Sequence, residues 1–269
     1  MKNILVIIVF VVTSYSVTSQ IYIDKIDTKI FPIESKENAS NTNKLVEEVN
    51  LDPTYFILGT LSDYMGRFSA VTSDHQVDRY YPYEEILVNY LTTYIASNLN
   101  IDVDTIFENS GHGKMFSSVL AKTLNSFYNE DGQLMNDKFI TKPQIYSFLT
   151  GVYYRNGIKL DSTIYKIQLV NSPKHRNCYK LLKDINCTNI FYKYLQNIPA
   201  QFTLYFEPTE KLRQYLKIIE EDRILLTDSF DMTYIEQLKL NKKELEELKE
   251  MILTRKEKEI EIIKNAFTW

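Results

Sequence analysis

The chain has 269 residues, 31 Lys and Arg against 35 Asp and Glu, a formal net charge of −4 and 44% hydrophobic residues. These values are ordinary for a soluble globular protein and exclude a wholly disordered chain, while the two cysteines exclude a disulfide-rich scaffold and a multi-cysteine zinc module. The mildly acidic balance without a basic stripe argues against a general nucleic-acid binder, so we expect no nucleic-acid partner.

The first 19 residues have the pattern of a secretory signal peptide. Lys2 supplies one positive charge, Ile4 to Val12 is an apolar run of nine residues, and Val17-x-Ser19 fits a cleavage site before Gln20. The run is shorter than the roughly 20 residues that span a bilayer. The pattern predicts export to the periplasm or the extracellular medium, with no membrane span after cleavage. An uncleaved anchor or a buried first strand is the alternative.

The rest of the chain divides into a lead-in and one folded region. Residues 20–42 predict an extended lead-in or linker, because the isoleucines between positions 21 and 33 fit a short edge strand and residues 35–43 are polar. Residues 43–269 predict a single, mainly helical globular domain, with an alternative subdivision near 157–162. Abundant Ile, Lys, Asn and Tyr, with 20 tyrosines, favour an AT-rich bacterial genome as the source.

Helical signals dominate the first part of the folded region. Asp52 followed by Pro53 predicts a helix start, and Thr141-x-x-Gln144 predicts a capping box. Residues 69–81 are expected to form a polar loop. Further helices are expected at 82–98, 103–108 and 114–128.

The pattern changes in the middle of the chain. Runs at 164–170 and 202–206 predict strands, and a helix is expected between them at 190–198. Residues 231–267 predict one long or once-broken helix. The expected fold is therefore mainly α, of the α+β class: an irregular helical domain with a small β element in the middle and a long C-terminal helix.

The recognised catalytic and nucleotide-binding motifs do not occur. The chain has no HExxH, no GxSxG and no GxGxxG. A loop with Gly111, Gly113 and Lys114 departs from the Walker pattern, yet a glycine-containing loop that opens a helix can hold an anion on free backbone N–H groups. A plain N-terminal turn is the alternative. No cofactor and no metal site are predicted.

The densest polar cluster in a predicted loop lies at residues 73–79. It contains Asp74, His75 and Asp78, and an Asp beside a His can orient a general base. Together with His112 in the 110–114 turn, these residues are the candidate catalytic groups. A solvated loop is the alternative, and His175 is read as an exposed helix start.

Cys178 and Cys187 are nine residues apart. In an oxidising compartment the expectation is one disulfide between them, provided that the helix carrying Cys178 ends near residues 184–186 and turns back. Two buried thiols are the alternative.

The C-terminal helix mixes eight Lys or Arg with seven Glu between Lys239 and Lys264, which indicates a solvated face or a helix that docks on a partner protein. The sequence as a whole predicts an exported, non-enzymatic binding or interaction protein. The alternative is an exported hydrolase whose site is built from loops 73–79 and 110–114.

Overall fold

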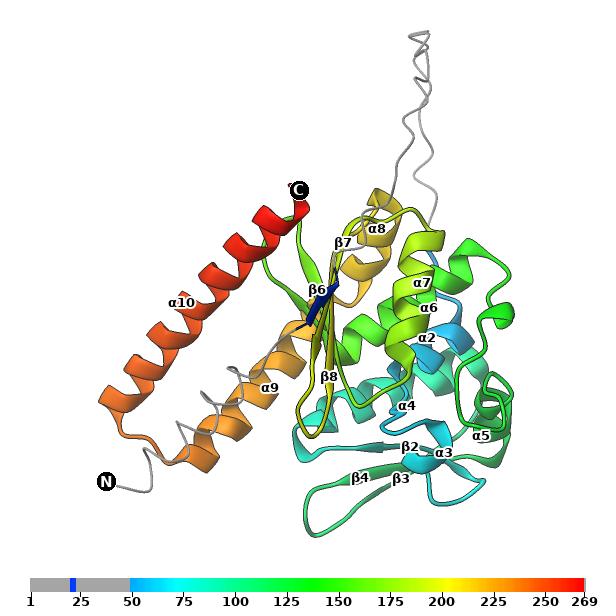
Figure 1. Ribbon diagram of the computed structural model, residues 1–269. Helices are drawn as coiled ribbons and strands as arrows, with labels where there is room; N and C mark the ends of the chain where they lie inside the picture. Colours follow the sequence, from blue (N-terminus) through cyan, green and yellow to red (C-terminus); the bar gives the residue numbers. More distant parts are fainter. Residues whose placement is uncertain (1–19, 23–48, 269) are drawn as a thin grey trace, which may run out of the picture.

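The computed structural model describes residues 20–22 and 49–268 (Figure 1). The fold mixes helices and strands: about 55% of the described residues are helical and 18% lie in strands, which form two small antiparallel sheets. The predicted signal peptide lies outside the described residues. The proposed division into residues 1–19, 20–42 and 43–269 stays a prediction, because most of its first two parts also lies outside them.

The described chain falls into two halves followed by a helical hairpin. The first half contains α2 (Pro53–Thr60), α3 (Arg67–Ala70), β2 (Gln76–Tyr80), α4 (Glu85–Leu99), β3 (Asp104–Phe107), β4 (Gly113–Phe116) and α5 (Ser118–Asn125). The second half contains α6 (Lys142–Asn156), β5 (Gly157–Lys159), β6 (Tyr165–Val170), α7 (Lys174–Asp184), β7 (Thr188–Leu195), β8 (Gln201–Glu207) and α8 (Glu210–Ile218). The hairpin consists of α9 (Glu220–Leu238) and α10 (Lys242–Phe267).

The two halves repeat one topology. The smaller sheet has the order β2-β4-β3, and the larger sheet has the order β1-β7-β8-β6-β5, with β1 at Gln20–Tyr22. In the first half β2 pairs with β4, which pairs with β3, and in the second half β6 pairs with β8, which pairs with β7. The β6-β8-β7 core of the larger sheet thus corresponds to β2-β4-β3, and β5 and β1 extend it on either side.

The first helices of the two halves cross in close backbone contact. A Cβ atom added at Gly59 of α2 would lie 2.1 Å from the carbonyl oxygen of Phe148, and one added at Gly151 of α6 would lie 2.0 Å from that of Phe56. The relation is reciprocal, since each glycine faces the carbonyl three residues before the other. Both helices are buried around most of their circumference, as expected for a pair at the centre of a core.

The predicted helix starts are confirmed at the two central helices. The Asp52 carboxylate accepts hydrogen bonds from the amides of Thr54 and Tyr55 at the start of α2. Thr141 and Gln144 form the predicted capping box at the start of α6. These caps satisfy backbone donors that a helix leaves unpaired at its first turn.

The β content exceeds the predicted small middle element. Residues 104–107 and 114–116, predicted as helical, belong to the strands of the β3–β4 hairpin, and Gly111 in its turn has a φ of +81° that favours glycine. Residues 76–80 of the predicted loop at 69–81 form strand β2. Most of the helix expected at 190–198 is strand β7, whose β-branched and aromatic residues pack across the larger sheet.

The helical region at the C-terminal end of the sequence is interrupted once, between α9 and α10. Lys239 adopts a left-handed conformation after α9, and Asn241 caps α10 by accepting hydrogen bonds from the Lys243 and Glu244 amides. α10 then runs beside the larger sheet, on the face opposite the one that packs on α6 (Figure 1). No helix among the described residues is both long and apolar enough to cross a membrane.

The helix crossing gives a stability prediction. We expect Gly151→Ala to lower the free energy of unfolding by about 3 kcal/mol, because the new methyl group meets a backbone carbonyl that cannot rotate away. This outweighs the roughly 1 kcal/mol that alanine gains over glycine in a helix. Urea unfolding measures the change, with Ser97→Ala on the exposed side of α4 as the control. A Gly151→Ala protein as stable as the wild type would contradict the close crossing.

Candidate functional site

The candidate acid Asp78 lies in a buried ion-pair network. Its carboxylate contacts the Arg155 guanidinium at 2.7 Å and accepts hydrogen bonds from the Ser62 amide at 3.1 and 3.0 Å. Arg155 comes from the last turn of α6 and also binds Glu84 at 2.7 Å. Burial raises the pKa of Asp78, and the charge of Arg155 opposes that rise. These bonds commit the Asp78 oxygens to joining the two halves of the chain.

The candidate histidines lie far apart along one strand. His75 precedes β2 beside the end of β4, where its Nδ1 lies 2.9 Å from the Ser118 hydroxyl. His112 precedes the start of β4, where its Nδ1 lies 3.0 Å from the Ser110 hydroxyl. Both rings and Asp74 are exposed. The structure therefore does not bring Asp74, His75, Asp78 and His112 into one site.

The predicted anion loop is the turn of the β3–β4 hairpin and does not open a helix. Gly113 and Lys114 are strand residues, and Gly111 lies in the turn before them. The Lys114 ammonium pairs with Glu108 at 2.7 Å, and this hydrogen bond lowers the pKa of the Glu108 carboxyl. Among the described residues, no group of three or more His, Cys, Asp or Glu side chains is placed to hold a metal ion.

Both cysteines are buried free thiols, so the predicted disulfide is not formed in this structure. Cys178 lies in α7 near the charges of Lys174 and Asp63, while Cys187 follows that helix and lies near the Thr209 backbone. Burial raises the pKa of Cys178 to about 12 and that of Cys187 to about 11. The two thiols thus have separate surroundings that both favour the protonated form.

His175 is buried, and the expectation of an exposed helix start is wrong. Its ring stacks on Phe202 of β8 with centroids 3.7 Å apart, and its Nδ1 lies 2.7 Å from the Ser172 carbonyl oxygen. Burial lowers the pKa of the imidazole. His175 is therefore part of the packing between α7 and the larger sheet.

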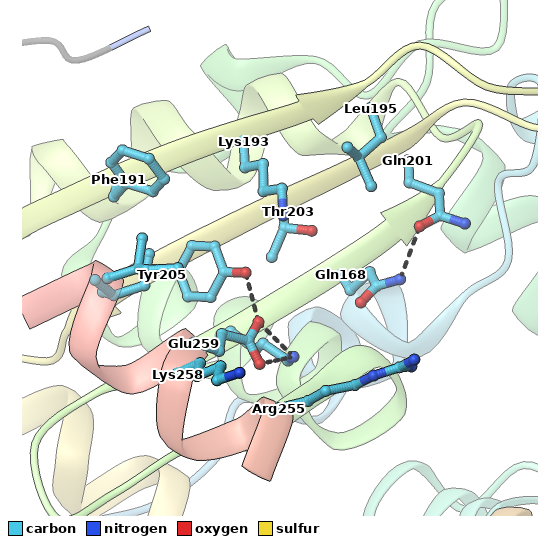
Figure 2. A pocket seen from close by; sticks show the side chains of 13 residues that line it. Gln168, Phe191, Lys193, Leu195, Gln201, Thr203, Tyr205, Arg255, Lys258 and Glu259 are labelled. Carbon is cyan, nitrogen blue, oxygen red and sulfur yellow. Dashed lines mark hydrogen bonds and ion pairs between the residues drawn. The ribbon is translucent and has the colours of Figure 1, made fainter. Parts of the chain in front are cut away.

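A groove between the larger sheet and α10 is lined by a cluster of charged and polar side chains (Figure 2). Its volume is about 530 Å³. The sheet supplies two cations, three neutral hydrogen-bonding side chains and three larger side chains: Lys166, Lys193, Gln168, Gln201, Thr203, Phe191, Leu195 and Tyr205. α10 supplies Arg255, Lys258, Glu259, Ile262 and Ile263.

The strand register builds the floor of this groove. Thr203 in the central strand β8 lies opposite Gln168 on one side and Lys193 on the other. The Gln168 amide donates to the Gln201 side chain at 3.3 Å. Because alternate residues of a strand face the same side, these polar side chains share one face while their apolar neighbours pack into the core.

Glu259 is the single carboxylate that lines the groove. The Lys166 ammonium lies 2.9 and 3.0 Å from its two oxygens, and the Tyr205 hydroxyl donates to it at 2.6 Å. Four cations and one carboxylate line the groove. No described side chain pairs with Lys193 or Lys258, so these two ammonium groups can bind an added anion.

A small apolar cluster holds α10 in place. Ile263, which is 2% exposed, packs with Leu160, Ile164, Phe191 and Tyr205 of the sheet half. The helix expected to dock on a partner protein thus docks on its own chain. The groove is therefore built from segments separated by tens of residues.

The floor of this groove has a signal in the sequence that is not a motif. In the run from Tyr165 to Val170, and again from Gln201 to Phe206, polar residues alternate with large apolar ones. Such alternation on two neighbouring strands marks a face that is open to solvent.

The buried network yields a prediction about pH. Arg155→Met should lower the free energy of unfolding at pH 7 by about 3–5 kcal/mol, because it leaves buried carboxylates without their cation. Without Arg155 the pKa of Asp78 rises further above its unfolded value, so the folded variant binds protons more tightly and its stability rises as the pH falls from 7. Urea unfolding between pH 5 and 8 checks this, with the exposed Lys243→Met as control. A loss that grows on acidification would contradict it.

The thiols yield a second prediction. At pH 8 a thiol reagent such as dithionitrobenzoate should react with neither cysteine of the folded protein, because burial blocks access and suppresses the thiolate. In urea without reductant, both should react. A chain that shows no thiol in urea until a reductant is added would instead contain the disulfide predicted from the sequence.

Comparison with known proteins finds similar solved structures. No protein-family model matches the chain, and no curated protein matches it. Full-length DUF199/WhiA from Thermatoga maritima matches with a TM-score of 0.39 and 15% identity, over 69% of this chain and 66% of that one. The chain therefore spans just under two thirds of that protein's length. The N-terminal LAGLIDADG domain of DUF199/WhiA matches with a TM-score of 0.38 and 17% identity, over 62% of this chain and 83% of that one.

These neighbours correct several predictions made from the sequence. The two neighbours are described as DUF199/WhiA and as its N-terminal LAGLIDADG domain, and neither description is of an exported binding protein or a hydrolase. The predictions of an exported binding protein, of an exported hydrolase and of periplasmic or extracellular localisation are contradicted and withdrawn. The expectation of no nucleic-acid partner is contradicted in the same way. With TM-scores below 0.5, the likeness itself assigns no activity to this chain.

Proposed function

We propose that the protein binds single-stranded nucleic acid in the groove between α10 and the larger sheet. The observation that supports this most is the groove's composition: four cations and one carboxylate surround a floor of neutral hydrogen-bonding side chains. Cations position a phosphate backbone, while amides and hydroxyls can contact base edges.

In this proposal the ammonium groups of Lys193 and Lys258 contact the phosphates. Lys193 extends from β7 and Lys258 from α10, so the two line the groove from opposite walls (Figure 2). A strand that runs between them would release condensed counterions, which is the main source of affinity for nucleic acids. The chain's overall charge of −4 does not prevent this, because fields are screened beyond about 8 Å at physiological salt.

In this proposal the side chains on the floor of the groove contact the bases. Gln168 and Gln201 offer amide donors and acceptors, and Thr203 offers a hydroxyl opposite Gln168. Phe191 and Leu195, which are 6% and 8% exposed, line the same face. Unpaired bases expose both their edges and their flat faces, and proteins bind them by combining such polar and apolar contacts.

The shape of the groove favours a single strand. α10 forms a wall along the sheet, held by Glu259 and by the packing of Ile263. A volume of about 530 Å³ lies within the range of small-ligand pockets. It accommodates nucleotide-sized groups between the walls, whereas a duplex would have to displace the helix.

The proposal predicts how Lys193→Gln changes binding. The variant should bind a fluorescein-labelled 12-residue oligothymidylate about tenfold more weakly, because one charge-assisted contact to phosphate is lost. The slope of log affinity against log salt should shrink by about 0.7, the value for one phosphate contact on a single strand. Fluorescence anisotropy measures both, and Lys122→Gln on the exposed face of α5 is the matched control.

Two further probes sharpen this experiment. A duplex of the same length should bind more weakly than the single strand, and thymidine monophosphate should compete poorly because it offers one phosphate. No binding of the labelled strand by the wild type, or equal effects of Lys193→Gln and Lys122→Gln, would contradict the proposal. Displacement by the mononucleotide at matched phosphate concentration would point to a free nucleotide as the ligand.

A further inference from the structure

We infer that Lys166 and Tyr205 form a phosphate subsite in this groove and that Glu259 occupies it as an internal competitor. The inference rests on the proposed function and adds to it the place where one phosphate binds and the group that it must displace. The competing contact, between Glu259 and these two residues, lies within the chain itself.

The donors around Glu259 suit a phosphate oxygen. The carboxylate receives the Lys166 ammonium at 2.9 and 3.0 Å and the Tyr205 hydroxyl at 2.6 Å. An ammonium and a hydroxyl that converge on an anionic oxygen make charge-assisted hydrogen bonds, and phosphate accepts the same bonds as carboxylate. Lys166 and Tyr205 face each other across β6 and β8, so the sheet fixes their spacing.

The competitor can leave without moving the helix. The Glu259 side chain is 28% exposed, whereas that of Lys166 is 12% exposed, so the carboxylate lies nearer to solvent than the cation it neutralises. Rotation about its side-chain bonds would take it into water. Ile263 keeps α10 packed on the sheet meanwhile, so Lys258 stays at the opposite wall.

In some molecules Glu259 fills the subsite, and those molecules cannot bind a phosphate there. The apparent affinity of the protein for its ligand is lowered in proportion to their fraction. A ligand that needs the open state binds with its intrinsic affinity multiplied by the open fraction. Removing the charge of Glu259 should therefore strengthen binding, although the change adds no contact to the ligand.

The test compares Glu259→Gln with Glu257→Gln. Both lie on α10 and remove one negative charge, but Glu257 is exposed and does not line the groove. With the labelled oligothymidylate, Glu259→Gln should bind about two- to fivefold more tightly than the wild type, and Glu257→Gln should bind like the wild type. Equal gains in the two variants would overturn the inference, because they would reflect net charge alone.

A double-mutant cycle places the effect at the subsite. In a Lys166→Gln background the Glu259→Gln change should give no gain, since the carboxylate then has no cation to occupy. A gain that persists without Lys166 would overturn the inference. Thermal unfolding of each variant confirms that the folded state is being compared.

A third variant distinguishes competition by the Glu259 side chain from obstruction of the sheet face by α10 as a whole. Ile263→Ala weakens the packing of α10 without a change of charge and should weaken binding, because the wall that carries Lys258 becomes less ordered. Tighter binding by this variant would show that α10 only obstructs the face, and would overturn the subsite. Failure of both the wild type and Glu259→Gln to bind the strand would instead overturn the proposed function.

Discussion

The close crossing of α2 and α6 is the constraint on which the remaining structure depends. Gly59 and Gly151 bring the two backbones together, and each half of the chain continues from one of these helices into its own sheet. The crossing also fixes the end of α6, from which Arg155 reaches Asp78 and Glu84 in the other half. The close contact of the two helix backbones and the buried ion-pair network thus stabilise the same junction. Both sets of contacts are lost if the helices separate.

The groove follows from this junction by way of the larger sheet. β6 packs one face against α6, so its alternate residues, among them Lys166, must face outward. The C-terminal hairpin then returns over that outer face and closes it on one side. The cationic character of the groove is a local property, because the chain as a whole is acidic. A cleft lined mainly by positive charge attracts anions even when the net charge of the chain is negative.

Local signals in the sequence predicted local structure, and long-range geometry escaped them. The cap at Asp52 and the box at Thr141 were readable because a helix start depends on a few adjacent residues. Strand β3 was not, since its four residues are all exposed and carry no alternation. The alternation in β6 and β8 indicated one open face, but the groove itself could not be predicted, because Lys166, Lys193 and Glu259 come together only after the sheet forms and α10 folds back. The dispersed histidines illustrate the converse: adjacency in sequence between Asp74 and His75 did not create a site.

Photochemical cross-linking tests most directly where nucleic acid binds. A 12-residue strand carrying 5-iodouracil would be irradiated with the wild-type protein, and the modified peptides identified by mass spectrometry. Binding in the groove predicts adducts on peptides from β6, β7 and β8, with further adducts on α10 around Lys258. Adducts confined to the smaller sheet or to α5, or spread evenly over the exposed surface, would contradict binding at the larger sheet.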